Sequence, residues 1–331
     1  MRAEPNAYNN VAPADASLME AEMQEVDAVI TQRLASQVVL VNQIAGYITG
    51  AGGKRVRPML VLLFANALGF RGPERFELAA TVEFIHTATL LHDDVVDESD
   101  LRRGKKTANA LFGNAASILV GDFVYSRAFQ MMVSVNRMRV LEVLSDATNV
   151  IAEGEVLQLM NMHNPDVHVS DYLKVIRFKT AKLFEASARL GAVLAEAPSE
   201  IEEACANYGR SLGTAFQLVD DLLDYEGTTA ELGKNVGDDL REGKPTLPLL
   251  LAMERGSTAE RELIRAAILE GEVARLPEVI EVVRRTGSID ATREAAREQI
   301  QLAQQSLVGL RPSIYRDALI NLCVRSLDRS S

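Results

Sequence analysis

The chain has 331 residues, of which 47% are hydrophobic and 24% are charged, with a formal net charge of −11. This length allows one large domain or two ordinary ones, and the apolar fraction excludes global disorder. The negative charge, with no basic tract to offset it, argues against nucleic acid as the main partner. Only two cysteines, Cys205 and Cys323, are present and they lie far apart, which is typical of a reduced, cytoplasmic protein.

The elements follow one another as helices. Residues 1–16 are expected to form a flexible segment that is neither a signal peptide nor an anchor. Helical spacing of apolar residues predicts a helix from Ser17 to about Ile48, ended by the glycines at 50–53. Pro58 is expected at the start of the next helix, which runs to about Gly69. Further helices are expected at about 74–98, 115–135, 138–162, 170–195 and 200–226, with shorter ones after a charged loop at 227–243.

The fold class expected from this pattern is all-α. Polar/apolar alternation and Asn-Gly hairpins are absent, and 101–108 reads as a basic loop. We see neither a fixed-period repeat nor a Gly-, Ser- or Pro-rich linker, so residues 17–331 are predicted to form a single domain. The longest apolar run, Met59–Leu68, is too short to cross a bilayer.

Two aspartate motifs dominate the sequence. Asp93-Asp94-x-x-Asp97 and Asp220-Asp221-x-x-Asp224 each follow an apolar segment. On a helix, the first and last aspartate of each motif lie one turn apart on the same face. Like charges at that spacing are costly near a core unless cations compensate them. Carboxylate oxygens suit Mg²⁺, which commonly shares its ligand shell with substrate phosphates. One such motif is more often an acidic helix end, but two in matching settings favour a metal-dependent diphosphate site.

Basic residues near the motifs would compensate the negative charge of the diphosphates that Mg²⁺ leaves uncompensated. They stand at glycine-rich loops and in the helices that follow, and they comprise Lys54, Arg55, Arg57, Arg102, Arg103, Lys179, Lys234 and Lys244. Singly, each is more often a solvated surface charge. The order G-x-x-x-x-G-K-[ST] and a G-x-G-x-x-G fingerprint are both missing, so nucleotide binding is disfavoured. Glu83-x-x-His86 matches the spacing of di-iron bundles, but no second Glu-x-x-His follows, so that alternative is remote.

The order and spacing of these motifs resemble those of the trans-polyprenyl (isoprenyl) diphosphate synthases over about residues 17–327. The matching stretches are Gly52-Gly53-Lys54-Arg55-Val56-Arg57-Pro58, Asp93–Asp97, Arg102-Arg103-Gly104, Lys179-Thr180, Phe216–Asp224, Gly233-Lys234 and Gly243-Lys244-Pro245-Thr246. The resemblance implies a bundle of long helices around a deep cavity, usually a homodimer. It implies repeated addition of isopentenyl diphosphate to an allylic diphosphate, farnesyl diphosphate first. All motif positions are filled, which disfavours a non-catalytic partner subunit.

The resemblance also implies a role for each site residue. Catalysis is assigned to Asp93, Asp97, Lys179, Asp220 and Lys234. Metal binding, with three Mg²⁺ ions when substrate is bound, is assigned to Asp93, Asp94, Asp97, Asp220, Asp221 and Asp224. Isopentenyl diphosphate is assigned to Lys54, Arg57, His86 and Arg103. The allylic diphosphate is assigned to Arg102, Lys179, Thr180, Gln217, Lys234 and Lys244. His86 alone would more often be a buried core residue, and Thr180 could simply bond within its helix.

Product length is expected to depend on small residues before the first aspartate motif. Ala88 and Thr89 lie about one helical turn (~5.4 Å) before Asp93, where short-chain relatives carry bulky aromatics. A prenyl tail should pass them towards Ile85, Val120, Tyr125 or Phe129. The alternative is that Ala88 and Thr89 are small because two helices pack closely there. Octaprenyl diphosphate for a quinone side chain is the first product expected, and nonaprenyl diphosphate the second. A class I terpene cyclase is disfavoured, because it would carry an Asn/Ser/Glu-type second metal motif. Any membrane contact should be peripheral.

Overall fold

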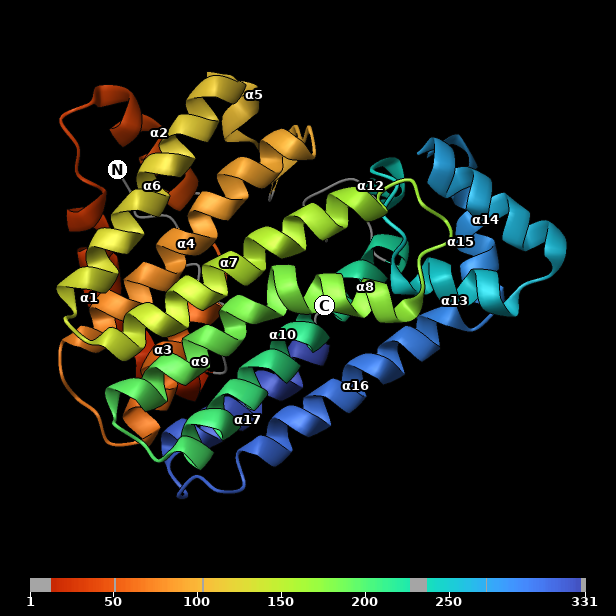
Figure 1. Ribbon diagram of the computed structural model, residues 1–331. Coiled ribbons are helices and arrows are strands. Elements are labelled where there is room, and N and C mark those ends of the chain that lie inside the picture. The colour runs from red at the N-terminus through yellow and green to blue at the C-terminus, as the bar shows by residue number, and fades with distance from the viewer. Residues whose placement is uncertain (1–12, 51, 103, 227–236, 272, 329–331) are drawn as a thin grey trace. The chain divides into compact units, whose positions relative to one another are not determined.

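The computed structural model describes residues 13–50, 52–102, 104–226, 237–271 and 273–328. The described chain is helical almost throughout, which confirms the all-α expectation (Figure 1). Its backbone contacts group into two compact units. Unit 1 comprises residues 1–145, 186–205 and 310–319, and unit 2 comprises residues 146–185, 206–309 and 320–331. The prediction of a single domain stays a prediction.

Unit 1 is built around helix α4. Its elements are α1 (Pro13–Leu34), α2 (Val39–Gly50), α3 (Val56–Ala67), α4 (Glu74–Val96), strands β1 (Leu101–Arg102) and β2 (Lys105–Lys106), α5 (Ala108–Phe112) and α6 (Asn114–Ser134). Helix α4 packs against α6, α3 and α1. Leu78, Val82 and Ile85 recur at helical spacing along α4 and are completely buried. Glu74 and Glu77 stand in its first turn, where negative charge stabilises a helix.

Unit 2 has its own apolar core. Its elements include α8 (Val169–Ile176), the π-helical turn η1 (Arg177–Ala181), α12 (Asp238–Arg241), α13 (Leu247–Arg255), α14 (Thr258–Glu270), the 3₁₀ turn η2 (Val273–Arg275), α15 (Leu276–Arg285) and α16 (Ser288–Ser306). The division between the units falls within α7 (Met138–Asn161), α9 (Lys182–Leu194), α10 (Ser199–Glu226) and α17 (Ile314–Leu327). Leu222, Leu249 and Ile264 belong to the core of unit 2.

The structure corrects the predicted first helix. The expected helix from Ser17 to Ile48 is broken at residues 35–38 into α1 and α2. Side chains supply the hydrogen bonds there: Ser36 Oγ accepts from the Val38 N–H, and Asn42 Oδ1 accepts from the Ser36 N–H. Such local bonds compete with a continuous helix. Part of the expected flexible segment, from Pro13 on, belongs to α1, and residues 1–12 lie outside the described range.

Three other elements differ from expectation. Helix α3 begins at Val56, two residues before Pro58, because the Arg55 carbonyl already accepts from the Met59 N–H. The predicted helix 170–195 is α8, η1 and α9 in succession. The predicted loop at 101–108 holds a short antiparallel hairpin, with Leu101 opposite Lys106, and Gly104 lies in its turn at φ 72°. The expectation that strands are absent is therefore wrong at this one place in the described chain.

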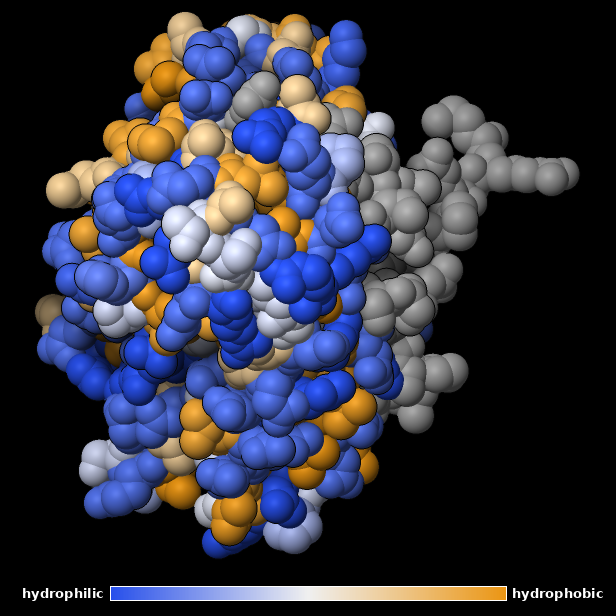
Figure 2. Space-filling view, turned by 90° about the vertical axis from the view of Figure 1, so that its right-hand side faces the viewer, coloured by the Kyte–Doolittle hydropathy of each residue, from blue (hydrophilic) through white to orange (hydrophobic). Residues whose placement is uncertain are grey.

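The surface facing the viewer in Figure 2 is mostly hydrophilic, with hydrophobic residues scattered among the polar ones. Among the described helices, none combines the length and the apolar character that a membrane crossing requires. The exposed apolar side chains that matter below lie on α5 and α6, where Leu111, Ile118, Leu119, Phe129 and Val133 are each more than a third exposed.

Candidate active site

The first aspartate motif lies at the C-terminal end of α4. Asp93 and Asp97 are partly exposed and one turn apart, and the Asp97 N–H donates to the Asp93 carbonyl over 2.8 Å. Asp94, between them, is completely buried. Arg102 places its Nε 2.8 Å and its Nη2 2.6 Å from Asp94 Oδ1. The two outer aspartates are thus partly exposed, whereas the middle one is inside the fold.

The charge of Arg102 is secured by this pairing. Burial lowers the pKa of its guanidinium, but the carboxylates of Asp94, Asp93 and Asp97 outweigh that effect and raise the pKa. Helix α5, which follows the hairpin that carries Arg102, is tied to α4 as well, since Asn109 Nδ2 donates to the Asp94 carbonyl over 3.1 Å. This anchoring keeps a permanently cationic side chain beside the aspartates.

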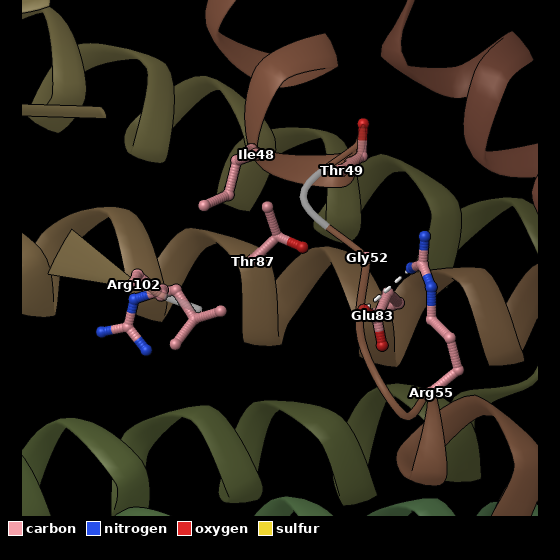
Figure 3. A pocket seen from close by; sticks show the side chains of 8 residues that line it. Ile48, Thr49, Gly52, Arg55, Glu83, Thr87 and Arg102 are labelled. Carbon is pink, nitrogen blue, oxygen red and sulfur yellow. Dashed lines mark ion pairs between the residues drawn. The ribbon is translucent and has the colours of Figure 1, made fainter. Parts of the chain in front are cut away.

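A pocket opens beside the glycine-rich loop of unit 1. It is lined by Ile48, Thr49, Gly52, Arg55, Glu83, Thr87, Leu90 and Arg102. In Figure 3, Arg55 and Glu83 form an ion pair on one side of the pocket, and Arg102 lies on the other. Of the residues expected to bind isopentenyl diphosphate, Lys54 is exposed in this loop, while Arg57 and His86 are partly buried on α3 and α4.

The second aspartate motif lies on α10 in unit 2. Asp220 is partly exposed, whereas Asp221 and Asp224 are buried. Asp221 accepts hydrogen bonds from the Tyr172 hydroxyl and, over 2.7 Å, from Gln217 Nε2. Burial is the main cause that raises the pKa of Asp221 to about 7, and the neighbouring charge of Asp239 adds to it. A negative charge at this position is therefore costly without a cation.

Further contacts join the second motif to the loop that carries Lys244. Asp224 Oδ2 accepts from the Asp239 N–H over 3.2 Å at the start of α12. The Lys244 N–H in turn donates to the Asp239 carbonyl over 2.8 Å, and its ammonium pairs with Glu242. Thr246, the next N-cap along the chain, donates to the Tyr225 hydroxyl over 3.3 Å. The loop is thus tied to Asp239 of α12 and to Tyr225 of α10, and α12 is itself tied to α10.

Lys179 and Thr180 stand in the π-helical turn η1. Lys179 Nζ lies 2.6 Å from Glu155 Oε2, and Thr180 Oγ1 donates to Gln217 Oε1 over 2.9 Å. A Cβ atom added at Gly154 would come within 2.6 Å of the Lys179 backbone nitrogen, so α7 approaches this turn closely. π-Helical turns are rare and often occur at functional sites.

Comparison with known proteins decides the family. The sequence profile described as "Polyprenyl synthetase" matches residues 38–283. The chain belongs to the polyprenyl synthetase family. It is 54% identical to octaprenyl diphosphate synthase of Escherichia coli (strain K12), over 93% of this chain and 96% of that protein. It is 45% identical to all-trans-nonaprenyl-diphosphate synthase (geranyl-diphosphate specific) of Rhodobacter capsulatus, over 92% and 94% of the two chains.

Solved structures agree with this assignment. The crystal structure of a polyprenyl synthase from Caulobacter crescentus CB15, complexed with calcium and isoprenyl diphosphate, superposes with a TM-score of 0.93 at 44% identity, covering 100% of both chains. The expected fold and the expected enzyme class, a long-chain trans-prenyl diphosphate synthase, are confirmed. Dependence on a divalent metal is typical of this family.

The donor atoms of this polyprenyl synthetase fit a divalent cation. Within the described ranges, no three His, Cys, Asp or Glu side chains gather closely enough to hold a metal without help. Mg²⁺ commonly uses only one or two carboxylates and takes its other oxygens from phosphates and water. Next to the partly exposed Asp93, Asp94 Oδ2 is buried and accepts no hydrogen bond from the described residues. Next to the partly exposed Asp220, burial raises the pKa of Asp221, so a cation beside either motif would compensate buried negative charge.

The structure brings the predicted residues together in two groups. Unit 1 holds Lys54, Arg57, His86, Asp93, Asp94, Asp97 and Arg102, and unit 2 holds Lys179, Thr180, Gln217, Asp220, Asp221, Asp224 and Lys244. Arg103 and Lys234 lie outside the described residues. Sequence reasoning missed the contributions of Glu83, Asn109, Glu155 and Tyr172. Only Glu83 carried a signal, since it is a charged residue within the apolar part of α4.

The predicted chain-length residues differ in their surroundings. Ile85 and Ala88 are completely buried on α4, and Val120 is nearly so on α6. Thr89 donates its hydroxyl to the His86 carbonyl over 2.9 Å. Tyr125 and Phe129 form an edge-to-face pair with ring centroids 5.3 Å apart, and Phe129 is 37% exposed. Their roles in product length stay predictions.

Proposed function

We propose that this chain elongates farnesyl diphosphate with isopentenyl diphosphate to octaprenyl diphosphate, the precursor of a quinone side chain. The observation that carries the proposal is the 54% identity, over nearly the whole length, to an octaprenyl diphosphate synthase. The two aspartate motifs of this sequence are the residues to which we assign the reaction. Nonaprenyl diphosphate is the second candidate, supported by the 45% identity to the Rhodobacter capsulatus protein.

We assign Mg²⁺ to both motifs, through Asp93 and Asp97 in the first and Asp220 in the second. Asp94, Asp221 and Asp224 support these ligands rather than contact the metal directly, because they are buried and hydrogen-bonded or ion-paired within the fold. When bound, three Mg²⁺ ions would neutralise the diphosphate and stabilise it as a leaving group. The family's divalent metal dependence and the calcium-bound Caulobacter structure support this assignment.

Basic side chains complete the chemistry. Arg102, Lys179, Thr180, Gln217, Lys234 and Lys244 are assigned to the allylic diphosphate, and Lys54, Arg57, His86 and Arg103 to isopentenyl diphosphate. The arginine and lysines assigned to the allylic diphosphate stabilise it with their positive charge as the allylic C–O bond breaks and a carbocation forms. The double bond of isopentenyl diphosphate attacks that carbocation to form the new C–C bond. A proton is then lost, and the released diphosphate accepts it. Exclusion of water protects the carbocation.

We also propose that the enzyme is a homodimer. Ile118, Phe129 and Val133 of α6 lie on one helical face, and Leu111 of α5 and Leu119 add to the exposed apolar area. Such a face fits a second copy of the same surface. Light scattering should give twice the monomer mass, and Val133→Glu should reduce it to the monomer mass. A monomeric parent protein would contradict the proposal. The cytoplasmic location expected from the sequence stays a prediction.

The reaction is tested with labelled isopentenyl diphosphate. Incubation with farnesyl diphosphate and Mg²⁺ should transfer label into butanol-extractable prenyl diphosphate, and a chelator should abolish the transfer. Restoring Mg²⁺ should restore it. Release of a cyclic hydrocarbon with isopentenyl diphosphate untouched would assign the chain to the terpene cyclases instead. Tightly bound iron with no demand for Mg²⁺ would favour a di-iron bundle.

A further inference from the structure

Arg55 is a basic residue of the glycine-rich motif to which no substrate contact is assigned. Its side chain is only 14% exposed, and its Nη1 lies 2.8 Å from Oε1 of Glu83, whose side chain is 13% exposed. Asp27, on α1, lies 3.8 Å from its other terminal nitrogen and is 46% exposed. The guanidinium therefore turns towards α4 and the Glu83 carboxylate, as the dashed line in Figure 3 shows.

The backbone at Arg55 is unusual. Its φ is 47° and its ψ is 34°, in the left-handed region, where a residue with a Cβ atom is disfavoured by about 1–2 kcal/mol. Gly52, three residues earlier, takes its left-handed turn at φ 74° with a glycine. A glycine would fit position 55 without strain as well, but it could not reach Glu83. Strain retained at such a place points to a function of the side chain.

Glu83 lies on the part of α4 that lines the pocket and precedes His86. Glu83, Thr87 and Leu90 follow one another at helical spacing and line the pocket beside the loop. His86 is three residues after Glu83, so it lies on the adjoining part of the same helix face. On the other side of the contact, Arg55 is the N-cap of α3, directly after Lys54 and two residues before Arg57. One ion pair thus joins the short segment 54–57 to the helix turn that carries His86.

We propose that Arg55 is a positioning residue which, through Glu83, sets the position of Lys54 and Arg57 relative to His86 for isopentenyl diphosphate. The inference rests on the proposed function, which assigns these three residues to that substrate. The pair is mostly buried, so water screens it little. Loss of either partner should leave Lys54 and Arg57 present but shifted from the positions in which they bind the substrate. Small shifts of binding groups reduce rates strongly.

The test compares four variants by steady-state kinetics. Arg55→Gly removes the side chain and also relieves the backbone, so a folding defect is not expected from strain. Glu83→Gln removes only the partner's charge. Each should raise the KM for isopentenyl diphosphate at least about tenfold and leave the KM for farnesyl diphosphate unchanged. The double variant should cost no more than either single change, because both remove one interaction. Arg55→Lys should recover part of the loss.

A control and the overturning results complete the design. Glu278→Gln removes the partner of Arg275 at an exposed ion pair and should leave both KM values unchanged. If Arg55→Gly raises the KM but Glu83→Gln does not, Arg55 binds substrate directly and the inference is wrong. Lower thermal stability with unchanged KM values in both variants would also overturn it. Lys54→Ala separates the two proposals: an unchanged KM for isopentenyl diphosphate there would refute the substrate assignment itself.

Discussion

Asp94 carries its carboxylate inside the fold, where two nitrogens of Arg102 approach one of its oxygens, while Asp93 beside it stays partly exposed. The two adjacent aspartates therefore have different surroundings: the Asp93 carboxylate is partly exposed, and the Asp94 carboxylate is buried against Arg102. We assign the partly exposed Asp93 to a metal cation, whereas Asp94 holds Arg102 in place. A buried ion pair that loses one partner leaves an uncompensated charge, which usually destabilises a protein strongly.

This difference predicts that an Asp→Asn substitution lowers mainly the activity at position 93 and mainly the stability at position 94. Asp93→Asn should lower kcat/KM by at least about 10²-fold with little change in stability, because it removes a carboxylate assigned to hold Mg²⁺ against the leaving diphosphate. Asp94→Asn should lower the free energy of unfolding by roughly 1–3 kcal/mol, less than for a fully buried pair since the Arg102 side chain is 31% exposed. Kinetics and urea unfolding of both variants measure this. An Asp94→Asn protein as stable as its parent would contradict the assignment.

The two cysteines give a residue-scale prediction about pH. Burial raises the pKa of Cys205 to about 12 and that of Cys323 to about 11. The native state therefore keeps both thiol protons above the ordinary value of 9.0, and the free energy of unfolding should fall as the pH rises from that value towards 12. At pH 8, a disulfide reagent should find no reactive thiol in the native protein and two after unfolding. Rapid reaction of the folded protein would contradict this burial.

At the scale of elements, the π-helical turn η1 depends on a close approach of α7. A Cβ atom at Gly154 would lie 2.6 Å from the Lys179 nitrogen and 2.9 Å from Phe178 Cβ, and backbone cannot easily give way. Gly154→Ala should therefore cost roughly 1–3 kcal/mol of stability and lower activity by displacing Lys179.

Gly46→Ala is the matched control for that substitution. Gly46 is also helical, but a Cβ atom there meets nothing within 4 Å, so alanine should be neutral or stabilise by up to about 1 kcal/mol. Thermal or urea unfolding of the two variants compares them directly. Equal stabilities would mean that α7 and η1 can separate without cost, contrary to the structure.

Sequence patterns predicted the long helices well because each has a continuous apolar face of its own. The expected helices at 74–98, 138–162 and 200–226 agree with α4, α7 and α10 to within two residues. What could not be predicted depends on contacts between distant segments. The turn η1 needs Gly154 beside Lys179, and the hidden position of Asp94 needs Arg102 to fold back onto α4.

Two local signals were present but were not used. Ser36 can cap a helix, and its bonds with Asn42 and Val38 do separate α1 from α2. Gly104, at φ 72°, is suited to the tight turn of the hairpin β1–β2. For the candidate site, the motifs identified which residue types matter. They could not say that Arg55 would turn to Glu83 and leave Lys54 at the surface.

For the molecule as a whole, the open question is what limits the length of the product. Ala88 is completely buried on α4, before the first aspartate motif. If the growing prenyl tail passes it, Ala88→Phe should shorten the main product to three or four isoprene units with little loss of stability. Geranyl diphosphate, which has two units, is the primer for this test, so that a product of three units requires one addition. The same change at the exposed Ala259 of α14 is the control and should leave the product unchanged.

Two measurements on Ala88→Phe distinguish the explanations: product length by mass spectrometry and stability by urea unfolding. If Ala88 is small only because helices pack closely there, phenylalanine would overpack the core, lower stability by roughly 1–3 kcal/mol and leave the product length as it was. An unchanged product would therefore exclude Ala88 from chain-length control.

The most direct test of the account is the product itself. The enzyme would be incubated with farnesyl diphosphate, excess isopentenyl diphosphate and Mg²⁺, and the extracted prenyl products would be weighed by mass spectrometry. We predict one dominant linear product of eight isoprene units. A product of nine units would move the assignment to the second candidate. A dominant product of four units or fewer, or no consumption of isopentenyl diphosphate, would contradict the proposal that this chain is a long-chain polyprenyl diphosphate synthase.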